Sequence, residues 1–263
     1  MKKTLEKIKT RLNIHYRDLK NGVNNGINGI KRDVRNGIER GANGIEGAKK
    51  IVKEQPIPKK HPISVVSGIA AIVIFWSFIL FAFALYPGGF NPLENWMSDL
   101  GNLVKNPNGA YFFNLGCIIS GICLFFFFIG LYEWYIGGIR NKILTILTQF
   151  AGFISALSLM MIGFSPINYF KSHMFWALIF FTVSSFVSFF PSVALYKFKF
   201  TRNTAKFGFL VCAFNVFFRF FVTIPIFEWI AIFLSFSFIL VIIYSMQKRV
   251  KRFRAVRNGN IVV

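Results

Sequence analysis

An aspartate and a histidine are the residues of this chain whose types could carry out chemistry together. Acids are scarce, because six of the ten Asp and Glu residues lie within the first 54 positions. A polar loop at 91–114 holds two of the other four, Glu94 and Asp99, and His173 begins a later apolar run. An Asp–His pair that reaches one proton can act as general base and acid on a lipid head group. It could equally be a proton relay or a structural clasp, and Asp99 could simply cap a short helix.

Other kinds of chemistry are not indicated. A histidine without a second His or Cys at ligand spacing does not predict a metal site. The chain has no serine in a nucleophile-elbow pattern and no phosphate-binding glycine loop. We therefore predict neither a metal nor a cofactor.

The polar loop lies between long apolar runs. Residues 63–85 carry no charge, and about 20 apolar residues cross a hydrocarbon core of roughly 30 Å as a helix. Six such runs predict an all-α membrane protein built as a six-transmembrane-helix bundle. The runs are 63–85, 110–131, 144–164, 173–196, 207–224 and 229–246.

The net charge of +21 could suggest a nucleic-acid partner, but the placement of the charges argues against one. Sixteen of the 31 Lys and Arg residues precede the first run, and the C-terminal tail and two loops on that side carry most of the others. The opposite side has only Lys105 and Lys171 in its loops. This asymmetry predicts a multi-pass protein of the cell membrane with both termini in the cytoplasm. The basic tails should also attract anionic head groups of the bilayer.

The same pattern divides the chain into a basic tail at 1–62, a membrane domain at 63–247 and a second basic tail at 248–263. Residues 21–47 repeat Asn-Gly-Ile with apolar members near the α-helical period, which predicts an amphipathic, partly disordered cytoplasmic segment. Seven glycines weaken that helix. The segment could be solvated, could lie on the membrane surface, or could dock a protein or a second copy of the chain.

The predicted topology gathers polar residues near the outer face. Arg219 should lie about five residues, roughly 8 Å, below the outer end of its helix. We expect it to pair with an acid of this group or to reach a lipid phosphate. The group consists of Glu94, Asp99, Asn106, Asn114, His173, Arg219 and Glu228.

The loop also resembles a known family, catalogued as domain of unknown function 998, of six-span archaeal and bacterial membrane proteins. The resemblance covers about residues 63–247 and implies six spans with an outer Asp–His motif, but no reaction. It rests on Asn95-Trp96-Met97-Ser98-Asp99-Leu100-Gly101-Asn102, on Asn106-Pro107, on Phe113-Asn114-Leu115-Gly116, and on Gly163-Phe164-Ser165 followed by His173.

Two functional hypotheses follow. The first is a non-enzymatic lipid-binding, scaffold or sensor protein with a polar site at the outer face, favoured because nothing marks a nucleophile or a metal. The alternative is a membrane-embedded lipid-modifying enzyme, with Asp99 and His173 as acid and base and Arg219 on the lipid phosphate.

Overall fold

A computed structural model describes residues 62–134, 139–199, 201–220 and 224–257, together with six single residues of the N-terminal tail. The predicted helical stripe at 21–47 lies almost entirely outside the described residues. Every element in the described ranges is helical. The α-helices are α2 (Ile63–Ala84), α3 (Ala110–Gly130), α4 (Ile139–Phe164), α5 (Phe170–Leu195), α6 (Arg202–Phe220) and α7 (Pro225–Arg257), and the 3₁₀ helices are η1 (Met97–Gly101) and η2 (Leu131–Trp134).

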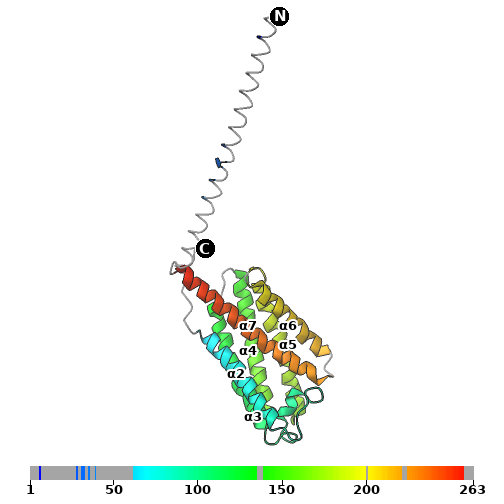
Figure 1. Ribbon diagram of the computed structural model, residues 1–263. Coiled ribbons are helices and arrows are strands. Elements are labelled where there is room, and N and C mark those ends of the chain that lie inside the picture. The colour runs from blue at the N-terminus through cyan, green and yellow to red at the C-terminus, as the bar shows by residue number, and fades with distance from the viewer. Residues whose placement is uncertain are drawn as a thin grey trace. The chain divides into compact units, whose positions relative to one another are not determined.

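The chain forms two compact units, Pro58–Lys251 and Met1–Ile57 with Arg252–Val263. In the first unit, successive helices lie side by side and run in opposite directions (Figure 1). We call the end that carries the connection from α2 to α3 the loop end. The opposite end, where α4 and α6 begin and α5 finishes, is called the basic end.

Five of the helices are long and apolar enough to cross a membrane, namely α2, α3, α4, α5 and the Pro225–Lys248 part of α7. The sixth, α6, is shorter and carries charged residues near both of its ends. An all-α membrane protein is therefore confirmed. Of the six predicted spans, five correspond to described helices that are apolar enough to cross a membrane, and the sixth corresponds to the less apolar α6.

Four helices begin a few residues before the predicted apolar runs. For example, α4 begins at Ile139, where the sequence predicted 144, and α6 begins at Arg202, where it predicted 207. Hydropathy detects only the part of a helix that lies in hydrocarbon, whereas polar residues at the membrane surface can continue the same helix.

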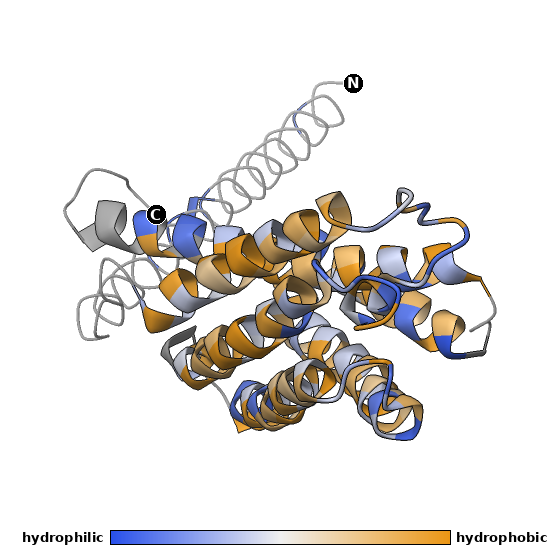
Figure 2. Cartoon of the chain, turned by 90° about the horizontal axis from the view of Figure 1, so that it is seen from below, coloured by the Kyte–Doolittle hydropathy of each residue, from blue (hydrophilic) through white to orange (hydrophobic). Residues whose placement is uncertain are grey.

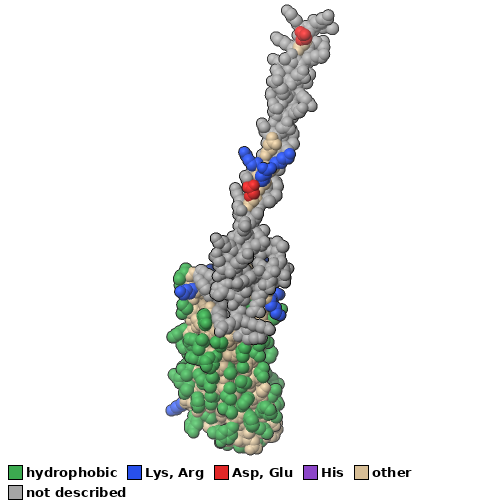
Figure 3. All heavy atoms as spheres, turned by 90° about the vertical axis from the view of Figure 1, so that its left-hand side faces the viewer, with side chains coloured by type: hydrophobic (Ala, Val, Ile, Leu, Met, Phe, Trp, Pro, Cys, Tyr) green, Lys and Arg blue, Asp and Glu red, His purple; other side chains and the backbone are tan. Residues whose placement is uncertain are grey.

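Large apolar side chains cover the bundle, and small polar side chains lie among the apolar residues of its core. Leu80 and Phe150 are each 65% exposed, whereas Ser188 and Ser192 are buried. Figures 2 and 3 show apolar residues along the helices and over one face of the bundle. Several buried hydroxyls donate to carbonyls within their own helix, as Ser192 does to Ser188 at 2.7 Å. This distribution suits a lipid environment, where small residues allow helices to approach closely.

Candidate functional site

The connection between α2 and α3 is an ordered structure held by short polar side chains. It turns through Gly88 and Gly89, whose φ angles of 74° and 87° favour glycine. Asn91 and Asn95 then bond within the loop, where the Asn91 N–H donates to the Asn95 Oδ1 at 3.2 Å. Asn and Asp commonly stabilise turns in this way, because their side chains reach nearby backbone groups.

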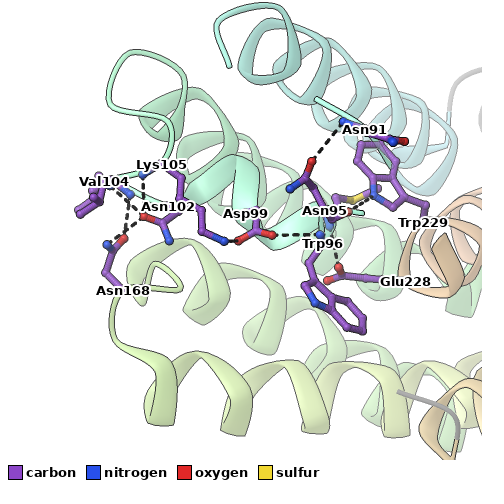
Figure 4. Close-up of polar contacts among 12 residues, drawn as sticks. Asn91, Asn95, Trp96, Asp99, Asn102, Val104, Lys105, Asn168, Glu228 and Trp229 are labelled. Atoms are coloured by element: carbon purple, nitrogen blue, oxygen red, sulfur yellow. Dashed lines mark hydrogen bonds and ion pairs between the residues drawn. The ribbon is translucent and has the colours of Figure 1, made fainter. Parts of the chain in front are cut away.

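Asp99 lies within η1 and uses both of its carboxylate oxygens inside the loop. One oxygen accepts the Trp96 N–H at 3.1 Å, which caps the start of η1. The other is paired with Lys105 Nζ at 2.8 Å, and Asp99 is buried whereas Lys105 is half-exposed. The predicted capping role of Asp99 is therefore observed, together with a lysine partner that the sequence analysis did not foresee (Figure 4).

Replacing Lys105 with Gln should lower the stability by at most about 1 kcal/mol, because a partly solvated ion pair contributes little. The hydrogen bond to Asp99 raises the pKa of Lys105, although burial opposes this effect. The contribution should be complete below the ordinary lysine pKa of about 10.4 and should be lost as the pH rises through the higher folded-state value. Melting temperatures in detergent from pH 8 to 12 would show the difference between wild type and K105Q shrinking only above about pH 10. The exposed Lys171→Gln variant is the control, and a difference that persists at pH 12 would contradict this assignment.

Asn106 joins three segments at the loop end. Its side chain is fully buried, and its Nδ2 donates to the carbonyls of Ala82 at 3.0 Å and Leu100 at 2.9 Å. Its Oδ1 accepts the Gly109 N–H at 3.1 Å. The end of α2, η1 and the start of α3 are thus tied to one amide. Asn106, which the sequence analysis predicted as a site residue, therefore holds the loop end together through its side-chain hydrogen bonds.

Asn114 ties the same loop to α3. Its Nδ2 donates to the Gly101 carbonyl at 3.1 Å, while its buried Oδ1 has no hydrogen-bond partner in the structure. A Cβ on Gly101 would lie 2.5 Å from the Phe113 ring and 2.7 Å from the Asn114 Oδ1. The glycine of the Ser-Asp-Leu-Gly motif is therefore required by close packing.

A pair of asparagines fastens the loop to the connection between α4 and α5. The Leu103 N–H donates to Asn168 Oδ1 at 2.8 Å, and Asn168 Nδ2 donates to Asn102 Oδ1 at 3.1 Å (Figure 4). Sequence reasoning missed Asn168, since contacts between segments 65 residues apart leave no local pattern.

Glu228, in the first turn of α7, holds η1 from the opposite side. Its Oε2 accepts the Met97 N–H at 2.7 Å, and its carboxylate also receives a backbone hydrogen bond from Ser98. The next residue strengthens this junction, because the Trp229 ring packs against Phe90 at 5.5 Å between ring centres. Glu228 is buried, and no cation pairs with it in the part of the chain that the structure describes.

His173, in the first turn of α5, is also buried. Its Nδ1 lies 2.8 Å from the Ser165 carbonyl oxygen. A carbonyl can only accept, so Nδ1 carries the hydrogen and Nε2 is the nitrogen that can gain or lose a proton. Within the motif Gly163-Phe164-Ser165…His173, the Ser165 carbonyl thus fixes the orientation of the His173 imidazole.

A cavity of about 20 Å³ lies between these groups, with room for about one water molecule. Its polar lining comes from Ser98 of η1, Cys117 of α3, His173 of α5 and Glu228 of α7. Asp99 is not among the lining residues, so the acid that shares a space with His173 is Glu228. We call Ser98, His173, Glu228 and this space the buried polar centre.

The remaining predicted site residues lie elsewhere. Glu94 is exposed on the loop. Arg219 donates a hydrogen bond to Thr182 Oγ1 on α5 and forms no ion pair within the described residues, so the predicted pairing with an acid is not what the structure shows. Among the described residues, no three His, Cys, Asp or Glu side chains are grouped as a metal site would require.

The chain has the features of a multi-pass membrane protein, namely a helical bundle with an apolar surface and a polar loop end. The chain belongs to the family described as Protein of unknown function (DUF998), whose model matches residues 69–246. The predicted resemblance is therefore confirmed. No curated protein and no solved structure matches the chain.

Proposed function

We propose that the protein is a non-enzymatic membrane sensor in which the buried polar centre takes up a proton and controls how firmly η1 is held. One observation carries this proposal. Glu228 accepts the Met97 N–H of η1 and lines the same water-sized cavity as His173. A change of protonation at this centre therefore acts directly on a bond that anchors the loop.

The surroundings of Glu228 support a proton-dependent contact. A buried carboxylate without a cation partner carries a free-energy cost that its protonation removes. Protonation also converts one acceptor oxygen into a hydroxyl, which weakens its bonds to backbone N–H groups. The groups facing it are Ser98 and Asp99 from η1, Cys117 from α3 and His173 from α5, and of these His173 is the one that ordinarily titrates near neutral pH.

The same geometry favours a sensor over an enzyme. The cavity holds about one water molecule, which leaves no space for a lipid head group beside His173. Asp99, the predicted partner of His173, is engaged by Lys105 and the Trp96 N–H. If the termini are cytoplasmic, as the positive-inside rule predicts, the loop end faces outward and the sensor responds to external acidity.

Hydrogen exchange of the full chain in lipid nanodiscs tests this function. We expect amide protection over 96–102, corrected for intrinsic rates, to fall at least threefold as the pH drops from 8 to 5. Glu228→Gln should remove most of this pH dependence, because the amide cannot take up the proton. His173→Gln should shift the midpoint of the change, because it removes the second proton acceptor.

The matched control is Glu94→Gln, an exposed acid of the same loop, which should behave as wild type. Equal pH dependence in wild type and Glu228→Gln would overturn the proposal. So would protection in the wild type that does not change between pH 8 and 5.

A lipid-modifying enzyme is a second candidate, favoured because Ser98 and His173 line one cavity. In this version His173 Nε2 acts as base, with its orientation held by Ser165. Incubation with mixed phospholipids followed by lipid mass spectrometry tests it. Product that forms with wild type and is absent with His173→Gln would favour the enzyme, and no product from either would exclude it for those lipids.

A further inference from the structure

A second cavity lies at the basic end, far along the helices from the buried polar centre. It has a volume of about 90 Å³, is partly open to the surface, and is lined by η2, α4, α5, α7 and the turn before α6. Apolar side chains such as Ala194, Leu195, Ile242 and Met246 form much of its wall. None of the residues assigned to the loop end takes part in it.

Besides Asn141, the polar residues of the wall are threonines and a serine, and their hydroxyl groups are already bonded. Thr145 and Thr148 donate to carbonyls of their own helix, at 2.8 and 2.7 Å. Thr201 donates to the Leu195 carbonyl at 2.8 Å, and Ser245 shares a hydrogen bond of 2.7 Å with Thr204. Because these hydroxyls are already bonded, three of them to backbone carbonyls, the cavity favours hydrocarbon over a polar solute.

Exposed cations flank the lining residues on three helices. Arg140 and Lys142 lie on either side of the lining residue Asn141, Arg202 follows the lining residue Thr201, and Lys248 lies two positions after Met246. Beyond Asp99 the sequence contains only two acids, Glu133 and Glu228, and Glu228 belongs to the loop end. An apolar space at the end of the bundle that carries these cations is complementary to a molecule with a hydrocarbon chain and an anionic head.

We propose that this cavity binds part of one acyl chain of an anionic phospholipid, with the phosphate held by the cations at the basic end. The volume agrees with such a ligand, since an apolar cavity of about 150 Å³ admits benzene and a smaller one admits a segment of alkyl chain. The site is distinct from the buried polar centre and does not depend on the sensor function. The proposed ligand is thus an anionic phospholipid, and it binds at the basic end, opposite the site that the sequence predicted.

Photo-cross-linking locates the ligand without any substitution. Full-length protein in nanodiscs is irradiated with phosphatidylglycerol that carries a diazirine in one acyl chain, and the adducts are mapped by mass spectrometry. We expect adducts at lining positions such as Thr145, Ala194 and Met246. Adducts confined to lipid-facing positions such as Ile143 and Leu147, which are 51% and 39% exposed, would overturn the proposal.

A cavity-filling variant measures affinity. Ala194→Phe places a ring in the cavity, whereas Ala213→Phe adds the same ring on the exposed face of α6. Native mass spectrometry should show phosphatidylglycerol binding weakened roughly tenfold in A194F and unchanged in A213F, equivalent to about 1.4 kcal/mol. Wild-type binding by A194F, at an unchanged melting temperature, would overturn the proposal, and the cross-linking decides the case if A194F does not fold.

The head group is tested separately. Phosphatidylcholine with the same chains should bind less tightly than phosphatidylglycerol, and Arg140→Gln combined with Lys142→Gln should reduce this preference. Glycerol phosphate, which has no chain, should not compete for the site. Competition by glycerol phosphate as effective as that of the lipid would show a phosphate site without a chain site and would overturn the proposal.

Discussion

Replacing Glu228 with alanine is expected to lower the free energy of unfolding by about 2–4 kcal/mol. The variant removes the acceptor of the Met97 and Ser98 N–H groups, and a buried donor left without a partner costs about 1–3 kcal/mol. Glu228→Gln keeps one carbonyl oxygen as acceptor and should lose about 1 kcal/mol. Thermal unfolding of the full chain in one detergent at pH 7.5 measures both variants.

The control for this prediction is Glu94→Ala, which removes an exposed acid from the same end of the bundle. It should change the stability by less than about 0.5 kcal/mol. If Glu228→Ala and Glu94→Ala melted at the same temperature, Glu228 would not hold η1.

Replacing Asn106 with leucine should have the largest effect, about 3–5 kcal/mol or a failure to fold. The substitution leaves the carbonyls of Ala82 and Leu100 without their side-chain donor at a fully buried position, and it removes one of the two acceptors of the Gly109 N–H, which keeps its bond to the Asn106 carbonyl. The yield of monodisperse protein and its melting temperature provide the measurement.

Asn108→Leu is the matched control, because Asn108 lies in the same turn and is exposed. It adds the same side chain and should be tolerated. Equal behaviour of the two variants would show that the three bonds of Asn106 do not determine the structure of the loop end.

The fold could be predicted from the sequence because a bilayer imposes a simple length rule on apolar helices. Runs such as 63–85 and 110–131 match α2 and α3 to within one residue at each end. The helices that continue into polar sequence, such as α4 and α7, were placed less well, because helix formation does not stop where hydropathy falls.

The candidate site could be predicted only in its general position. The grouping of polar residues at one end follows from counting spans, and Asp99, Asn106, Asn114, His173 and Glu228 are indeed all buried there. Which acid shares a space with His173 depends on the direction of side chains, and the structure gives this place to Glu228. The partner of Arg219 could not be predicted from the sequence either, because its contact with Thr182 depends on how α5 and α6 face each other.

The central claim is that Glu228 takes up a proton within the buried polar centre. Infrared difference spectroscopy of the full chain in lipid, recorded as the pH is lowered, measures this directly. Between pH 8 and 6, well above the ordinary Asp and Glu pKa values of about 4, we predict a carboxylic-acid C=O band that grows on acidification in the wild type and is absent in Glu228→Gln. An identical band in both proteins, or no such band in the wild type, would contradict the claim.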